Sequence, residues 1–114
     1  MNRKIKFRYY RPSTNVMIYP TTGNFNDLTE SEDWKVMQFT GAIDNKGKEI
    51  YEGDIVKLLG AFHPRYRPIN YCEYGSRFEI GELGLSFGQM KKDGYVDCEV
   101  VGNVFENPDL IKFF

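Results

Sequence analysis

The sequence is poor in the residues that most often perform chemistry. It contains one histidine, His63, and two cysteines, Cys72 and Cys98, which lie far apart and form no C-x-x-C pair. A histidine-based triad or a zinc site would have to use His63, and the cysteines lack the paired spacing of zinc ligands. The sequence therefore predicts no catalytic residues, no metal and no cofactor, and we expect a protein that is not an enzyme.

Long apolar runs and an excess of positive charge are also missing. No stretch approaches the roughly 18 apolar residues of a membrane span. The basic N-terminus has no apolar segment behind it, as a signal peptide would. We therefore expect a cytoplasmic protein with reduced thiols and no membrane partner. The net charge of −1 lacks the basic excess of many nucleic-acid-binding domains.

Aromatic side chains, by contrast, are abundant. They make up 16% of the 114 residues and comprise nine Phe, eight Tyr and one Trp. Tyr and Phe favour β-strands, and a chain of this length is typical of one domain. We expect residues 1–114 to form a single β-rich domain.

Short alternating segments predict where the strands lie. Residues 3–10 alternate, with apolar side chains on one face and Lys4, Lys6 and Arg8 on the other, and residues 16–19 would pair with them in a hairpin. Further strands are expected at residues 34–40, 55–59, 69–74, 77–80 and 96–101. The strands at 69–74 and 77–80 are close enough to form a second hairpin.

Turn residues separate these strands. Asp44–Gly47 has the pattern of a type I turn that ends on a left-handed glycine, and Glu52–Asp54 predicts a second tight turn. Residues 60–68, with two prolines, predict a loop.

The C-terminal segment combines a bulge with a helix start. Gly102 predicts a bulge, after which residues 104–105 would continue the strand. Asn107 and Pro108 fit the N-cap and first position of a short helix. Together these elements predict a mainly β fold: an antiparallel, barrel-like sheet of short strands (SH3-like or pseudo-barrel) with one short C-terminal helix.

Two segments resemble a known family. Residues 37–56, MQFTGAIDNKGKEIYEGDIV, resemble the signature of the YopX proteins, which are small proteins encoded in bacteriophages and prophages. Residues 100–110, VVGNVFENPDL, resemble the C-terminal signature of that family, and residues 5–8 fit its N-terminus. The resemblance implies a β-rich, barrel-like fold and a phage or prophage origin. It implies no activity and no site residues, because the family has no assigned biochemical function.

The polar residues of the long signature have two interpretations. Thr40, Asp44, Glu52 and Asp54 would form a polar site in the functional one. In the structural one they stabilise turns, where Gly takes a positive φ and Asp accepts neighbouring N–H groups. We favour the structural interpretation, and we therefore expect any function in residues 59–96, which match no part of the family pattern.

Arginine and aromatic residues interleave in the middle of the chain and join a basic first strand. The candidate interaction patch consists of Phe62, Arg65, Tyr66, Arg67, Tyr71, Tyr74, Arg77, Arg3, Lys6 and Arg8. Such residues are enriched at protein–protein hot spots, so a protein partner or self-association is the favoured function. The alternative is nucleic-acid binding, with affinity that falls as salt rises. An enzyme with an unrecognised site is the third hypothesis.

Overall fold

The computed structural model of the chain describes residues 5–20, 33–58, 65–73, 77–81, 85–86, 91–92 and 94–111. One sheet has the strand order β2-β1-β3-β4. Its strands are β1 (Phe7–Arg11), β2 (Val16–Ile18), β3 (Lys35–Ile43) and β4 (Glu49–Tyr51). β1 pairs with β2 in the predicted opening hairpin, with Tyr9 opposite Ile18.

The second sheet has the order β11-β5-β6-β7-β8. Its strands are β5 (Asp54–Leu58), β6 (Arg65–Cys72), β7 (Arg77–Ile80), β8 (Leu85–Ser86) and β11 (Cys98–Asn103). Two short strands, β9 (Lys91–Lys92) and β10 (Tyr95–Val96), form a separate pair. A 3-10 helix, η2 (Pro108–Ile111), follows β11.

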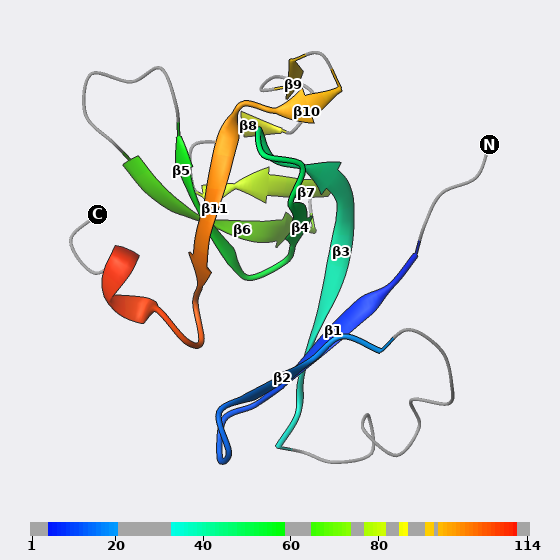
Figure 1. Ribbon diagram of the computed structural model, residues 1–114, viewed down its shortest axis with the longest axis vertical. Helices are drawn as coiled ribbons and strands as arrows, with labels where there is room; N and C mark the ends of the chain where they lie inside the picture. The colour runs from blue at the N-terminus through cyan, green and yellow to red at the C-terminus, as the bar shows by residue number, and fades with distance from the viewer. Residues whose placement is uncertain are drawn as a thin grey trace.

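The fold confirms the predicted class, because all described strand pairs are antiparallel and the second sheet curls into a half-barrel. Figure 1 shows the long strand β3 running from this curled sheet to the β1–β2 hairpin, which projects away from it. β3 therefore belongs to both halves of the molecule. Among the described residues, no helix has the length and apolarity needed to cross a bilayer.

The hydrophobic core lies inside the curled sheet. It consists of Ile50, Val56, Leu58, Ile69, Ile80, Val96 and Cys98. Burying one aliphatic side chain of this size stabilises a fold by about 1.5–3 kcal/mol. These residues come from six different strands, so the core joins segments that are distant in sequence.

Both predicted turns of the long signature are present. The N–H of Gly47 donates to the carbonyl of Asp44 at 3.0 Å, and Gly47 has a φ of 81°. Gly53, in the turn before β5, has a φ of 87°. A side chain at either position would strain the left-handed backbone, which explains why the sequence places glycine there.

The first strand does not alternate as predicted. Arg8, Tyr9 and Tyr10 are all buried, whereas Ile5 is exposed. Both faces of β1 are covered: on one face Arg8 is buried and the ring of Tyr10 stacks on Phe105 with centroids 5.1 Å apart, and on the other face Tyr9 is buried. A strand covered on both faces loses the alternation of apolar and polar residues that a half-exposed strand shows.

The loop expected at residues 60–68 is also partly wrong, because β6 already begins at Arg65. β6 pairs with β5 from Arg65 to Pro68 and with β7 from Ile69 to Cys72. A proline cannot donate the N–H that a strand paired on both sides requires. Pro68 is tolerated because it lies where β6 changes partner and is paired on one side.

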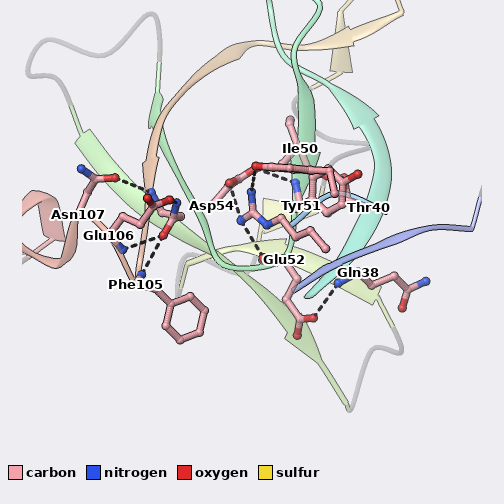
Figure 2. Close-up of polar contacts among 12 residues, drawn as sticks. Gln38, Thr40, Ile50, Tyr51, Glu52, Asp54, Phe105, Glu106 and Asn107 are labelled. Carbon is pink, nitrogen blue, oxygen red and sulfur yellow. Dashed lines mark hydrogen bonds and ion pairs between the residues drawn. The ribbon is translucent and has the colours of Figure 1, made fainter. Parts of the chain in front are cut away.

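The C-terminal strand ends earlier than predicted. The register shifts between Val100 and Gly102, which confirms the bulge, but the pairing stops at Asn103. Residues 104–106 form a turn instead of continuing the strand. The Oδ1 of Asn103 accepts the N–H groups of Phe105 and Glu106 at 3.1 and 2.8 Å, and this side chain therefore turns the chain away from the sheet (Figure 2).

The predicted short helix is present as η2, but Asn107 does not cap it with its side chain. The Oδ1 of Asn107 accepts the N–H of Asn103 at 3.2 Å, on the side away from the helix. The carbonyl of Asn107 accepts the N–H of Leu110. Asn107 thus closes the turn before the helix.

This arrangement predicts the effect of a methyl group at Gly102. A Cβ built there would lie 2.5 Å from Oδ1 of Asn107. We expect Gly102→Ala to lower the free energy of unfolding by about 1–3 kcal/mol, as other overpacked sites do. Urea denaturation measures the loss. The double variant Gly102→Ala/Asn107→Ala should recover part of it, and a double variant as unstable as the sum of the singles would contradict this explanation.

Candidate functional site

Three of the described cations of the predicted patch are buried or paired with carboxylates. Arg8 is buried, which removes it from any surface. Lys6 forms an ion pair with Glu49, and Nη2 of Arg77 lies 3.0 Å from the carboxylate of Glu79. Because these cations are matched by carboxylates of the same molecule, they are poor candidates for neutralising phosphates.

The remaining patch residues lie in or around β6. Tyr66 and Arg67 are half-buried, and Tyr71 is 48% exposed with its ring 5.3 Å from that of Phe78. The backbone of Arg65 belongs to β6, but its side chain lies outside the described part of the chain. Arg3, Phe62 and Tyr74 also lie outside the described residues.

Arg8 and Asp54 form an ion pair in the interior. Their side chains are each 3% exposed, and Nη2 of Arg8 lies 2.8 Å from Oδ1 of Asp54. The guanidinium is also close to the rings of Tyr51 and Tyr19, at 4.8 and 5.9 Å from their centroids. Burial raises the pKa of Asp54, and the charge of Arg8 opposes that effect. The pair connects β1 to the start of β5.

The other oxygen of Asp54 completes the turn between β4 and β5. Oδ2 accepts the N–H of Tyr51 at 2.7 Å (Figure 2). Thr40 is used in a similar way, since its Oγ1 donates to the carbonyl of Ile50 at 2.7 Å. These contacts support the structural interpretation of the signature residues.

Asp44 connects its own turn to a distant strand. Its side chain is buried, and Oδ1 accepts the N–H groups of Lys46 and Lys48 at 2.9 and 2.8 Å. Oδ2 accepts the N–H of Val100, in β11, at 2.9 Å. One carboxylate therefore closes the turn and attaches it to the edge of the curled sheet.

A groove lies next to the Glu52–Gly53 turn, between β3 and β6. Its volume is about 490 Å³, and it is lined by Val36, Met37, Glu52, Gly53, Ile69, Asn70, Tyr71, Val104 and Phe105. Val36 and Tyr71, which lie on two different sheets, are 45% and 48% exposed. Glu52 is the one charged residue among the groove residues.

Of the groove residues, the sequence predicted Tyr71 as part of an interaction site and missed the others. Val36 could have been found from the alternation of β3, because its side chain lies on the opposite face of the strand from that of the buried Met37. Val104 and Phe105 were missed because they were assigned to a continuing strand. The groove exists because β3 and β6 meet at the turn, which is a property of the tertiary structure.

The buried thiol of Cys98 provides a test of this packing. Burial, with a smaller contribution from Asp44, raises its pKa to about 12. At pH 8 only about one molecule in ten thousand would carry the thiolate that reacts with alkylating agents. We expect iodoacetamide to modify the half-buried Cys72 first in the native protein and to modify Cys98 only after denaturation, as read by mass spectrometry. Equal native rates would contradict this packing.

Within the part of the chain that the structure describes, no group of three histidine, cysteine or acidic side chains could hold a metal ion.

A family model described as YopX protein matches residues 6–112. The chain belongs to the YopX family. The matched range includes Asp44 and Asp54, whose carboxylates accept backbone N–H groups.

The fold of this YopX-family chain is similar to a solved structure. The crystal structure of protein EF1440 from Enterococcus faecalis superposes with a TM-score of 0.72 and 25% sequence identity, over 97% of this chain and 100% of that one. No match was found among curated proteins.

Proposed function

We infer that this YopX-family chain is a non-enzymatic accessory protein of a phage or prophage that acts in the host cytoplasm by binding another protein. The observation that supports this function is the groove between β3 and β6, with Val36 and Tyr71 exposed on its two sides. Exposed apolar and aromatic side chains that line one concave surface are typical of protein-binding sites. Of the four polar signature residues, Thr40, Asp44 and Asp54 are already occupied by structural hydrogen bonds, which leaves Glu52 in the groove.

Charge complementarity indicates the kind of partner. Glu52 contributes a carboxylate to an otherwise uncharged groove. The partner surface that fits it presents an apolar side chain next to a lysine or arginine. Such a partner can be a host protein, a phage protein or a second copy of the chain.

The test compares two valines with similar exposure. Val36 is 45% exposed in the groove, and Val16, on β2, is 43% exposed and does not line it. In affinity capture from phage-infected cells, a partner should bind the Val16→Asp variant as well as the wild type. Its binding to the Val36→Asp variant should be at least about tenfold weaker, as expected at a hot spot.

Light scattering on the same three proteins separates self-association from binding to another protein. A dimer that dissociates in Val36→Asp alone would identify the partner as a second copy. Capture that is equally strong for both variants would overturn the assignment of the groove. Capture of no protein from infected cells, together with a strictly monomeric wild type, would overturn the proposed function itself.

A further inference from the structure

We propose that the groove binds its partner as an extended peptide segment, which forms backbone hydrogen bonds with the free edges of β3 and β6. This proposal rests on the proposed function and specifies the form of the ligand. An edge strand with unpaired N–H and C=O groups is a template for a further strand. Here two such edges line opposite sides of one groove.

The free edge of β3 follows from its pairing with β1. The N–H of Phe39 donates to the carbonyl of Lys6 at 2.8 Å, so the odd-numbered residues of β3 direct their backbone groups toward β1. The even-numbered residues direct theirs the other way, since antiparallel partners alternate. The carbonyl of Gln38 accordingly accepts the N–H of Glu52 at 2.9 Å. Val36 is two residues from Gln38, so its backbone groups have the same orientation, and Val36 lines the groove.

The free edge of β6 follows in the same way. The carbonyl of Ile69 accepts the N–H of Gly53 at 2.9 Å, on the side away from β7. Tyr71, two residues later, directs its N–H and C=O to that side as well. β5 pairs with β6 only as far as Pro68, so no described strand pairs with this edge at Tyr71.

The Glu52–Gly53 turn already makes the contacts that an inserted strand would make. Glu52 donates its N–H to β3, and Gly53 donates its N–H to β6. The turn therefore closes one end of the groove. Beyond it, Val36 and Tyr71 occupy the next positions of the same orientation on the two strands. An extended segment placed there would continue the pattern that the turn begins.

The lining determines which extended segment fits. Val104 and Phe105 add apolar surface, while the carboxylate of Glu52 makes one 3.4 Å contact with the N–H of Gln38. A strand presents alternate side chains to opposite faces. The ligand is thus an extended segment with apolar side chains on one face and a lysine or arginine placed to meet Glu52.

The experiment uses a display library of random linear peptides, selected on the full chain and counter-selected on the Val36→Asp variant. Synthetic copies of the selected peptides are then bound to the native protein, and amide hydrogen exchange is followed residue by residue. The amides of Val36 and Tyr71 should exchange at least tenfold more slowly in the complex. The amides of Met37 and Asn70, already directed into the sheets, serve as internal controls.

Two further measurements probe the ligand. N-methylation of the peptide should weaken binding at consecutive positions of its central segment, because a strand paired on both sides directs successive N–H groups alternately to β3 and to β6. Glu52→Gln should reduce the preference of the library for lysine and arginine, with Gln38→Ala as the neighbouring control.

The outcomes distinguish the two hypotheses. Slowed exchange at Val36 and Tyr71 with sensitivity to N-methylation at consecutive positions supports an extended ligand paired with both edges. Selection of no linear peptide, while a captured folded protein still depends on Val36, overturns the extended ligand and leaves the proposed function in place. Unchanged exchange at both amides in a bound peptide also overturns it. Loss of dependence on Val36 for peptides and proteins alike overturns both.

Discussion

Arg8→Met should lower the free energy of unfolding by about 3–5 kcal/mol, which is the usual cost of removing one partner from a buried ion pair. The variant keeps a long unbranched side chain beside the Tyr51 and Tyr19 rings. It leaves Asp54, 3% exposed, without its guanidinium. Since small domains are stable by about 5–15 kcal/mol in total, a loss of this size would be visible as a large shift of the urea midpoint.

A second ion pair on the same strand provides the matched control. Nε of Arg11 lies 2.9 Å from Asp33, and both side chains are well exposed. Arg11→Met should cost less than about 1 kcal/mol, because exposed pairs are screened by water and salt. The double variant Arg8→Met/Asp54→Asn should regain part of the stability, since it removes the charge that Arg8→Met leaves unpaired. Equal losses for Arg8→Met and Arg11→Met would contradict the buried role of Arg8.

The loss in Arg8→Met should also depend on pH. Burial raises the pKa of Asp54 above its ordinary value, and without Arg8 the main opposing charge is gone. A carboxyl whose pKa is higher in the folded than in the unfolded state binds protons more tightly when folded. Lowering the pH through that raised pKa should therefore stabilise the variant relative to wild type. Urea titrations at neutral and acid pH measure this difference, and a loss that grows in acid would contradict it.

Asp44→Ala is the second large effect, with an expected loss of about 2–4 kcal/mol. The carboxylate accepts three backbone N–H groups, from Lys46, Lys48 and Val100, and is 1% exposed. When the side chain is removed, the N–H groups of Lys46 and Lys48 can bond to water instead, so the loss of stability stays below the sum of three charged hydrogen bonds. Most of the loss comes from the partly buried N–H of Val100, which is left without its acceptor.

The neighbouring Asn45 is the control for this substitution. Its side chain is exposed, and Asn45→Ala should change stability by no more than about 0.5 kcal/mol. Urea denaturation of both variants gives the comparison. Hydrogen exchange at Val100 adds a local readout, because Asp44→Ala should accelerate exchange of that amide. An unchanged Val100 amide would contradict the proposed link between the turn and β11.

Much of the local structure could be predicted from the sequence. The turns at Asp44–Gly47 and Glu52–Asp54 were predicted correctly because glycine at a positive φ and aspartate beside free N–H groups are short-range requirements. The β6–β7 hairpin and the bulge near Gly102 were also predicted correctly. The family resemblance rested on residues 37–56, 100–110 and 5–8, and the family match over residues 6–112 confirms it.

The candidate site was less predictable, and Arg8 shows why. Alternation along residues 3–10 placed Arg8 on a solvated face, since a period of two reports one buried face only. In the tertiary structure, Asp54, 46 positions further along the chain, meets Arg8 in the interior. No local pattern around Arg8 signals that partner. The predicted basic patch lost this member for that reason.

By itself, the sequence determined a β domain with specific turns and a family signature whose polar residues stabilise those turns. The tertiary structure alone decided which cations are buried or paired and where the surface is open. Pro68 lies in a strand because β6 changes partner there, and Val36 and Tyr71 line one groove because β3 and β6 both bond to the Glu52–Gly53 turn. Both outcomes depend on pairings between segments distant in sequence, which local propensity does not encode.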